Sequence, residues 1–121
     1  MEVINNIQKK IYESLSKKYK TVDVPEENTT FPFVRIAECN YTTERSKGSK
    51  TKDYNLEQEI HIWSNYEGKR EVNALIEAVC DIIEGIDFEY NTICNYCVSK
   101  NVVDMEGYKQ GILVFDIKIN G

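Results

Sequence analysis

The single histidine is the first residue whose type could support catalysis. Any Ser-His-Asp or Cys-His mechanism would have to use His61, because the chain has no other histidine. His61 lies in an alternating segment and shares one side of it with Glu57, Glu59 and Trp63. That side is expected to be polar and partly exposed. We therefore expect His61 and Trp63 to serve surface packing or a contact with another protein subunit.

Cys94 and Cys97 form a C-x-x-C pair, a spacing that can hold a metal ion or cycle between dithiol and disulfide. A structural zinc needs four ligands, and the other candidates, Cys39, Cys80 and His61, are scattered over elements of different kinds. A thioredoxin-like pair opens a helix, whereas this pair enters an expected strand. We interpret Cys39 and Cys80 as small core residues and the C-x-x-C pair as ordinary thiols. A small metal or redox protein centred on Cys94 and Cys97 is kept as an alternative.

Motifs for nucleotide binding and acid-base catalysis are absent from the sequence. The six glycines are dispersed, so neither a G-x-x-x-x-G-K-[ST] nor a G-x-G-x-x-G pattern occurs. Glu57 and Glu59 have no partner that marks them as a general acid and base. We expect no catalytic residue, no cofactor and no metal site, and hence a protein that is not an enzyme.

The length and charge of the chain limit its organisation and its partners. Its 121 residues are enough for one domain, spanning 1–121. The net charge of -5 argues against broad binding to nucleic acid or to an anionic membrane. The sequence has no signal-peptide pattern and no long apolar segment. We therefore expect a cytoplasmic protein with reduced thiols, without sequence recognition of nucleic acid and without a membrane partner.

One basic segment, Thr42 to Asp53, stands out locally. It has no large apolar side chain, and its four cations exceed its two anions; the cations are Arg45, Lys47, Lys50 and Lys52. Such a segment cannot bury itself, so it predicts a mobile loop. Solvation of this loop and contact with a partner protein both remain open. A partner contact would use these four cations together with His61 and Trp63.

Hydrophobic periodicity predicts two amphipathic helices. In the first, from Val3 onward, apolar residues are spaced three or four apart; they are Ile4, Ile7, Ile11 and Leu15. The second is expected over 66–84, with Ser64 and Glu67 forming a capping box at its start. Gly85 is expected to end this helix in the left-handed conformation.

Alternating segments predict two β-hairpins that follow the two helices in turn. The first hairpin pairs a strand from about Phe33 to Tyr41 with a strand that ends near Trp63, and Gln58 is the one polar residue on its apolar side. The second pairs residues 94–103 with 110–119, the latter as an interior strand. The expected fold is a two-layer α+β domain of order α-β-β-α-β-β, with a mainly antiparallel sheet backed by two helices.

The stretches "VDVPEENTTFPFVRIAE" and "EQEIHIWSNYEGKREVNALIEAV" carry a resemblance to a known family. Together with the order of elements, they resemble the tail-completion, or tail-terminator, proteins of long-tailed bacteriophages and prophages. The resemblance covers about Val24 to Gly85 and rests on structural motifs, so no catalytic residue comes with it.

The resemblance implies a virion assembly protein. Members of such a family form a hexameric ring that caps the tail tube and presents a surface to the head connector. The implied partners are copies of the chain itself, the tail tube protein and the head connector protein. The implied location is the bacterial host cytoplasm during assembly and then the tail or neck of the virion. A head-side connector or neck protein is the alternative within virion assembly.

Overall fold

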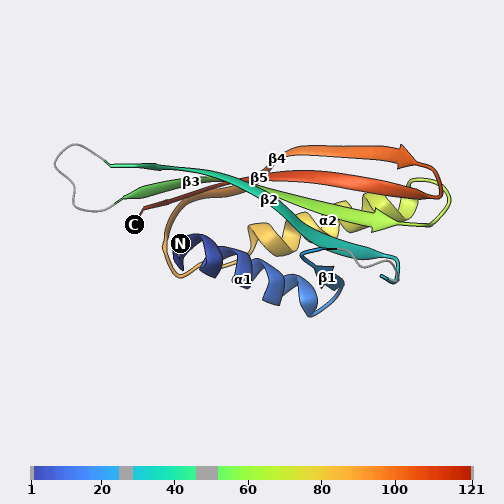
Figure 1. Ribbon diagram of the computed structural model, residues 1–121, viewed down its shortest axis with the longest axis horizontal. Helices are drawn as coiled ribbons and strands as arrows, with labels where there is room; N and C mark the ends of the chain where they lie inside the picture. Colours follow the sequence, from blue (N-terminus) through green and yellow to red (C-terminus); the bar gives the residue numbers. More distant parts are fainter. Residues whose placement is uncertain (1, 25–28, 46–51, 121) are drawn as a thin grey trace.

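The computed structural model describes residues 2–24, 29–45 and 52–120, which form a five-stranded sheet and two helices. In chain order the elements are α1 (Glu2–Ser16), β1 (Lys20–Val22), β2 (Phe33–Glu44), β3 (Asp53–Ser64), α2 (Arg70–Glu84), β4 (Asn91–Met105) and β5 (Tyr108–Asn120). The strand order is β1-β2-β3-β5-β4. Both helices lie against the same face of the sheet (Figure 1). The expected two-layer α+β class is confirmed.

The arrangement of elements differs from the expected one by the additional strand β1. This three-residue strand pairs in parallel with the start of β2, with Lys20 opposite Phe33. The other pairings are antiparallel. Three residues are too few to show a period of two, and β1 is a strand because β2 supplies its hydrogen-bond partners. The observed order is therefore α-β-β-β-α-β-β.

The two helices bury the stripes that their periodicity predicts. In α1 the buried side chains are Ile4, Ile7, Ile11 and Leu15. In α2 they are Val72, Ile76, Val79, Cys80 and Ile83, while Leu75 and Ile82 pack at the margin of the core. The expected interior strand is also confirmed, because β5 lies between β3 and β4 and buries Leu113, Phe115, Ile117 and Ile119.

The expected capping box at the start of the second helix is wrong. Ser64 is fully buried as the last residue of β3, and its hydroxyl donates to the carboxylate of Glu71. The same hydroxyl accepts the backbone N–H of Tyr66 at 3.3 Å. The helix begins only at Arg70, so Glu67 lies before it and is exposed. Ser64 thus ties the end of β3 to the first turn of α2 by a different carboxylate.

The end of α2 and the turn between β4 and β5 use glycine differently. Gly85 has φ -89°, so the expected left-handed conformation at this position is wrong. Its N–H closes the helix on the carbonyl of Asp81 at 3.2 Å. Gly107 does adopt the left-handed region, with φ +86°, and this permits the tight turn between the two strands.

The β2–β3 hairpin is longer than the sequence predicts. Thr42 lies opposite Asn55, and Glu44 lies opposite Asp53, so both ends of the expected loop Thr42 to Asp53 belong to strands. Strands in a hairpin pair through their backbones and need no apolar side chain. Composition alone therefore overestimates the length of the loop. The ends of β2 and β3 project beyond α1 (Figure 1).

A β-bulge in β2 interrupts its pairing with β3. Ile36 lies opposite Ile60 and Cys39 opposite Gln58, so two residues of β2 face Glu59 alone. Gln58 is fully buried beneath the bulge. Its amide nitrogen lies 3.1 Å from the carbonyl oxygen of Ala37, 3.4 Å from that of Glu38 and 2.9 Å from that of Glu59. This explains the polar residue on the apolar side of the strand.

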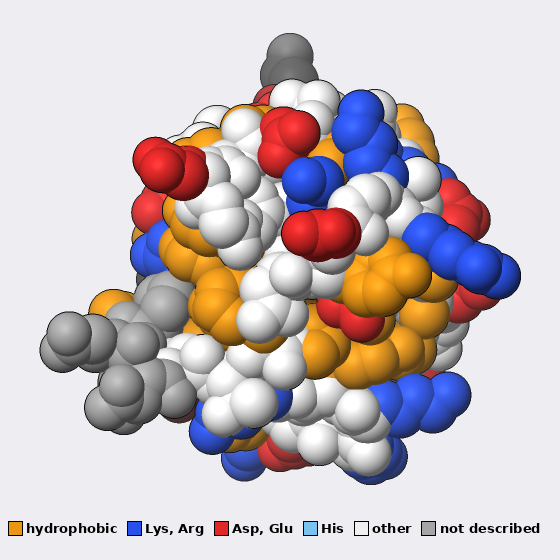
Figure 2. Space-filling model, turned by 90° about the vertical axis from the view of Figure 1, so that its right-hand side faces the viewer, with side chains coloured by type: hydrophobic (Ala, Val, Ile, Leu, Met, Phe, Trp, Pro, Cys, Tyr) orange, Lys and Arg blue, Asp and Glu red, His pale blue; other side chains and the backbone are white. Residues whose placement is uncertain are grey.

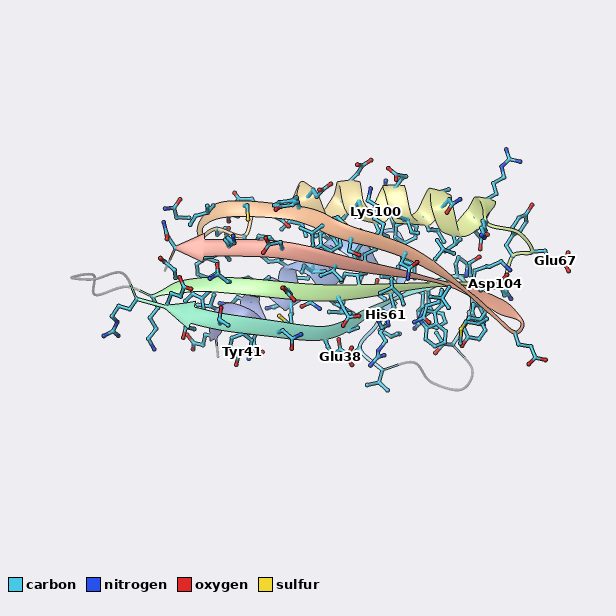
Figure 3. The ribbon with its side chains drawn as sticks, turned by 90° about the horizontal axis from the view of Figure 1, so that it is seen from above. Glu38, Tyr41, His61, Glu67, Lys100 and Asp104 are labelled. Atoms are coloured by element: carbon cyan, nitrogen blue, oxygen red, sulfur yellow. The ribbon has the colours of Figure 1, made fainter. Side chains whose placement is uncertain are left out.

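The face of the sheet opposite the helices, hereafter the open face, carries the outward side chains of β3. Glu57, Glu59, His61 and Trp63 alternate there with the core residues Leu56, Ile60 and Ile62. Figure 3 looks onto this face, with His61 on β3 and Glu38 on the neighbouring β2. The open face is therefore where the chemistry-bearing residues of β2 and β3 meet.

Candidate functional site

The residues expected to contact partners lie at two distant places. Arg45 follows β2 and Lys52 precedes β3, and both are exposed. Lys47 and Lys50 lie outside the described residues. His61 and Trp63 lie near the other end of β3. At about 3.3 Å per residue, the eleven steps from Lys52 to Trp63 span roughly 35 Å, so these residues do not form one site.

Trp63 belongs to an aromatic cluster at the end of β3. Its ring stacks on Tyr108 with centroids 5.1 Å apart and an interplanar angle of 3°. Phe33 lies 5.1 Å from Trp63 on the other side, and Phe31 contacts Phe33 and Tyr108. Figure 2 faces this end of the molecule, where hydrophobic side chains gather between charged ones. The indole ring of Trp63 is thus held mainly by contacts within the chain.

Tyr108 was not among the residues singled out from the sequence. It begins β5, and the pairing of Trp63 with Gln110 brings the start of β5 beside the end of β3. The indole nitrogen of Trp63 is buried and has no hydrogen-bond acceptor within the described ranges. A stack between residues 45 positions apart depends on sheet order, which the local pattern does not contain.

His61 is more buried than the partly exposed surface expected from its pattern. It is 9% exposed, and its ring has polar contacts on both nitrogens. Nε2 lies 3.2 Å from Oε1 of Glu59, and Nδ1 lies 3.3 Å from the side-chain nitrogen of Gln110. If Gln110 donates to Nδ1, Nε2 carries the proton and donates to Glu59. The two contacts fix the plane of the imidazole.

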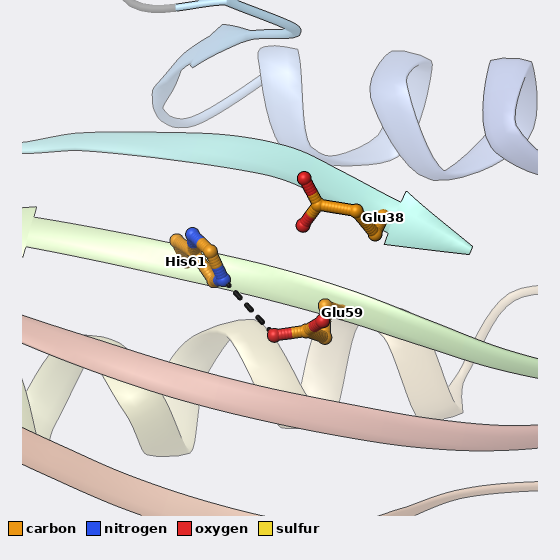
Figure 4. Close-up of side chains that lie close together, drawn as sticks. All are labelled: Glu38, Glu59 and His61. Carbon is orange, nitrogen blue, oxygen red and sulfur yellow. Dashed lines mark hydrogen bonds and ion pairs between the residues drawn. The ribbon is translucent and has the colours of Figure 1, made fainter. Parts of the chain in front are cut away.

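Glu38 completes a group of three chemistry-bearing side chains on the open face. One carboxylate oxygen of Glu38, one of Glu59 and a ring nitrogen of His61 all lie within 4.8 Å of one another. Figure 4 shows the three side chains converging from β2 and β3. The bulge in β2 places Glu38 there, because it puts an additional residue opposite Glu59. The sequence shows the pair Glu59 and His61 but has no signal for Glu38.

Cys94 and Cys97 lie on opposite faces of the sheet. Cys94 is opposite the exposed Lys118, and Cys97 is opposite the fully buried Phe115. Residues three apart on a strand point to opposite sides, because the side-chain period is two. The two thiols of the C-x-x-C pair therefore do not converge on a metal ion or on each other.

The structure brings Cys97 to Cys80 instead. Burial of Cys80, together with the nearby thiol of Cys97, raises the pKa of Cys80 to about 12. Two hydrogen bonds join α2 and β4 near this pair. Nζ of Lys100 donates to Oε1 of Glu77 at 3.4 Å, and the backbone N–H of Cys97 donates to Oε2 of Glu84 at 3.2 Å. Cys80 is a core residue as expected, and Cys39 is half-buried against the core.

The two edges of the sheet differ in what they expose. β4 forms one edge along its whole length and carries the exposed side chains Ile93, Tyr96 and Val98. Ile93 and Val98 are the additional residues of two bulges in β4. On the other edge, β1 pairs with Phe33 to Arg35, and the remainder of β2 is an edge within the described sheet. Exposed edges of this kind can pair with or pack against another chain.

Comparison with known proteins gives a structural match. No protein-family model matches the sequence, and no curated protein matches it either. Among solved structures, a chain described as "Virion of native gene transfer agent (GTA) particle" superimposes with a TM-score of 0.80 at 16% sequence identity. The match covers 98% of this chain and 98% of that one. The two chains therefore share a complete fold.

Within the residues that the structure describes, neither helix is both long enough and apolar enough to cross a bilayer.

Proposed function

We propose that this protein is a non-enzymatic virion assembly protein that caps the tail tube of a long-tailed phage or prophage. In this role it forms a hexameric ring and joins the tail to the head connector. The observation that carries the proposal is the likeness over 98% of both chains to a chain from a gene transfer agent virion. The motifs around Phe33 and Trp63, which resemble tail-completion proteins, support the specific position at the end of the tail.

A ring requires two different surfaces on each subunit that fit each other. The free part of β2 and the strand β4 lie at opposite edges of the sheet, as a head-to-tail contact between subunits requires. The bulges in β4 interrupt a continuous ladder and turn Ile93 and Val98 outward. We therefore assign to β4 an apolar contact with the neighbouring subunit. About 800 Å² buried per partner would make an ordinary specific interface.

The tip of the β2–β3 hairpin is proposed to face the tail tube. Arg45 and Lys52 are exposed there, and the hairpin projects beyond α1 (Figure 1). An exposed ion pair contributes about 0.2 to 1 kcal/mol, so these cations orient a partner rather than hold it. The proposed partners are the chain's own copies, the tail tube protein and the head connector protein. Assembly takes place in the host cytoplasm, and the finished position is the tail or neck.

Electron microscopy of the purified protein, with and without tails, tests this function. The wild-type protein should cap tails and form rings of six subunits there. Val98→Lys should leave the monomer folded and prevent ring closure, because it places a charge in the apolar contact of β4. Tyr12→Lys is the matched control, since Tyr12 is also an exposed apolar side chain, 45% exposed, but lies on α1. Rings that form normally with Val98→Lys would refute the assigned interface.

The alternative position on the head side is tested by the same material. A head-side connector or neck protein would attach to tailless heads and leave isolated tails bare. Attachment to heads alone would therefore overturn the tail-cap assignment while keeping a virion role. The other alternative, a metal or redox protein using Cys94 and Cys97, is disfavoured because these residues lie on opposite faces of the sheet.

A further inference from the structure

We propose that Glu38, Glu59 and His61 form a binding site for a divalent transition-metal ion on the open face of the sheet. Of the groups of histidine, cysteine and acidic residues in the described part of the chain, this one brings three ligand atoms within 4.8 Å of one another. The site does not depend on the proposed virion role, and it departs from the expectation that the chain holds no metal.

The distances within the group suit a single ion. Nε2 of His61 and Oε1 of Glu59 are 3.2 Å apart. Two ligands of one tetrahedral Zn²⁺, each about 2.0 to 2.2 Å from the ion, are separated by roughly 3.4 Å. The imidazole and one carboxylate therefore already have nearly the spacing of neighbouring ligands. Rotation of the exposed Glu38 side chain brings the third ligand into place.

The backbone beneath the site is rigid. Glu59 and His61 are two residues apart on β3, so their side chains leave the same face of a strand that is paired on both sides. The bulge sets the backbone position of Glu38, and Gln58 holds the bulge from below by hydrogen bonds to carbonyl oxygens on both strands. A bulge at such a position redirects a side chain, and here it directs a carboxylate toward the histidine.

Gln110 provides the support that metal-bound histidines usually have. It lies 3.3 Å from Nδ1 of His61, on the side of the ring away from Glu59. With the amide turned over, its oxygen accepts the Nδ1–H, which leaves the lone pair of Nε2 free for the ion. Such partners of the second ring nitrogen set the tautomer and the orientation of the ligand.

The carboxylates at the site attract a cation, and a nearby arginine lowers the affinity with which the site binds it. Glu38 and Glu59 contribute two negative charges, and Arg35 contributes one positive charge, with Nη2 3.9 Å from Glu38. Arg35 also lies directly opposite His61 in the register of β2 and β3. Nitrogen and carboxylate ligands together suit Zn²⁺ and related ions. Three protein ligands leave a fourth position for water or for a group from another molecule.

The single histidine makes the test direct. In ¹⁵N-labelled full-length protein without a histidine tag, the ring resonances belong to His61 alone. Titration with Zn²⁺ at constant pH should shift the Nε2 resonance and place the proton on Nδ1, with saturation at one ion per chain. The d–d spectrum of bound Co²⁺, without a thiolate charge-transfer band, should exclude the cysteines as ligands. Unmoved His61 resonances at stoichiometric saturation, or a thiolate band, would overturn the proposal.

Variants separate ligands from neighbours. Glu38→Gln and Glu59→Gln should each weaken Zn²⁺ binding more than about tenfold, and Gln110→Leu should weaken it about ten- to a hundredfold. Glu57→Gln is the matched control on the same face of β3 and should leave the affinity unchanged. Glu38 is exposed, so its variant keeps the fold even if Glu59→Gln does not. Equal affinity of wild type and Glu38→Gln would remove Glu38 from the site.

Zn²⁺ binding and ring formation can fail separately. The titration uses the monomer in solution and does not involve tails or heads. A protein that binds Zn²⁺ but caps no tails would contradict the proposed function alone.

Discussion

The side-chain amide of Gln58 donates a hydrogen bond to the main-chain carbonyl of Ala37 at 3.1 Å. This contact joins a fully buried polar side chain of β3 to the bulge of β2. The side-chain oxygen of Gln58, Oε1, accepts a hydrogen bond from the side-chain N–H of Gln8 at 3.1 Å, which links the bulge to α1. A buried amide is favourable here because both its nitrogen and its oxygen have partners. The bulge, and with it the group of Glu38, Glu59 and His61 on the open face, therefore depends on the buried Gln58.

Replacement of Gln58 by leucine should destabilise the protein. The change leaves carbonyls at the bulge without their side-chain donor, and an unsatisfied buried polar group costs about 1 to 3 kcal/mol. Urea unfolding measures the loss. Glu57→Leu, the same replacement at the preceding position of β3, is the control and should cost less, because the side chain of Glu57 is exposed. A loss from Gln58→Leu no larger than that of the control would show that the bulge does not depend on this amide.

Gly111 should resist enlargement, since α2 packs closely on β5 at this point. A Cβ at Gly111 would lie 3.1 Å from Cδ1 and Cγ1 of Ile76 and 3.4 Å from Val72. Gly111→Val is therefore expected to lower the free energy of unfolding by about 1 to 3 kcal/mol through overpacking. Calorimetry or urea unfolding measures this. Combination with Ile76→Val should recover part of the loss, and strict additivity of the two changes would contradict the close contact.

Cys80 should react slowly with alkylating reagents in the folded protein. Burial and the adjacent Cys97 raise its pKa to about 12, and the thiolate is the reactive form. At pH 8, mass spectrometry after brief iodoacetamide treatment should find Cys94, which is half-buried on the open face, labelled before Cys80. Labelling of Cys80 as fast as Cys94 would contradict its packing.

The same raised pKa predicts a change of stability with pH. The unfolded thiol loses its proton near the ordinary value of 9.0, while the folded thiol keeps its proton up to about pH 12. The contribution of Cys80 to stability is thus complete below pH 9 and is lost as the pH rises toward 12. Urea unfolding should show the difference between wild type and Cys80→Ala shifting against the wild type above pH 9. A difference that is constant from pH 8 to 11 would contradict this prediction.

Charge reversal at the tip of the β2–β3 hairpin should affect attachment and leave stability unchanged. Arg45 and Lys52 are exposed, so Arg45→Glu with Lys52→Glu is expected to change the free energy of unfolding by less than about 0.5 kcal/mol. Attachment to tails, counted by electron microscopy, should fall. Lys17→Glu with Lys18→Glu makes the same charge change after α1 and is the control. Equal attachment of both double variants would exclude the tip as a contact.

Local patterns predicted well those features that depend on neighbouring residues along the chain. Apolar residues three or four apart placed the buried stripes of α1 and α2, and alternation placed Leu56, Ile60 and Ile62 in the core. The prediction of a capping box was wrong because a matching spacing does not determine which carboxylate accepts the hydrogen bond of the Ser64 hydroxyl. β1 escaped prediction because three residues carry no period of their own.

Local patterning along the chain was sufficient to predict the class of fold, the two amphipathic helices and the side of β3 that faces the core, since the periods of 3.6 and 2 are local geometry. The strand order, the bulge in β2 and the partners of each reactive side chain became visible only in the folded chain. It joined Glu38 to Glu59 and His61, and Cys97 to Cys80 rather than to Cys94. These relationships depend on the register between strands and on the packing of helices against them, which join residues that are distant along the chain.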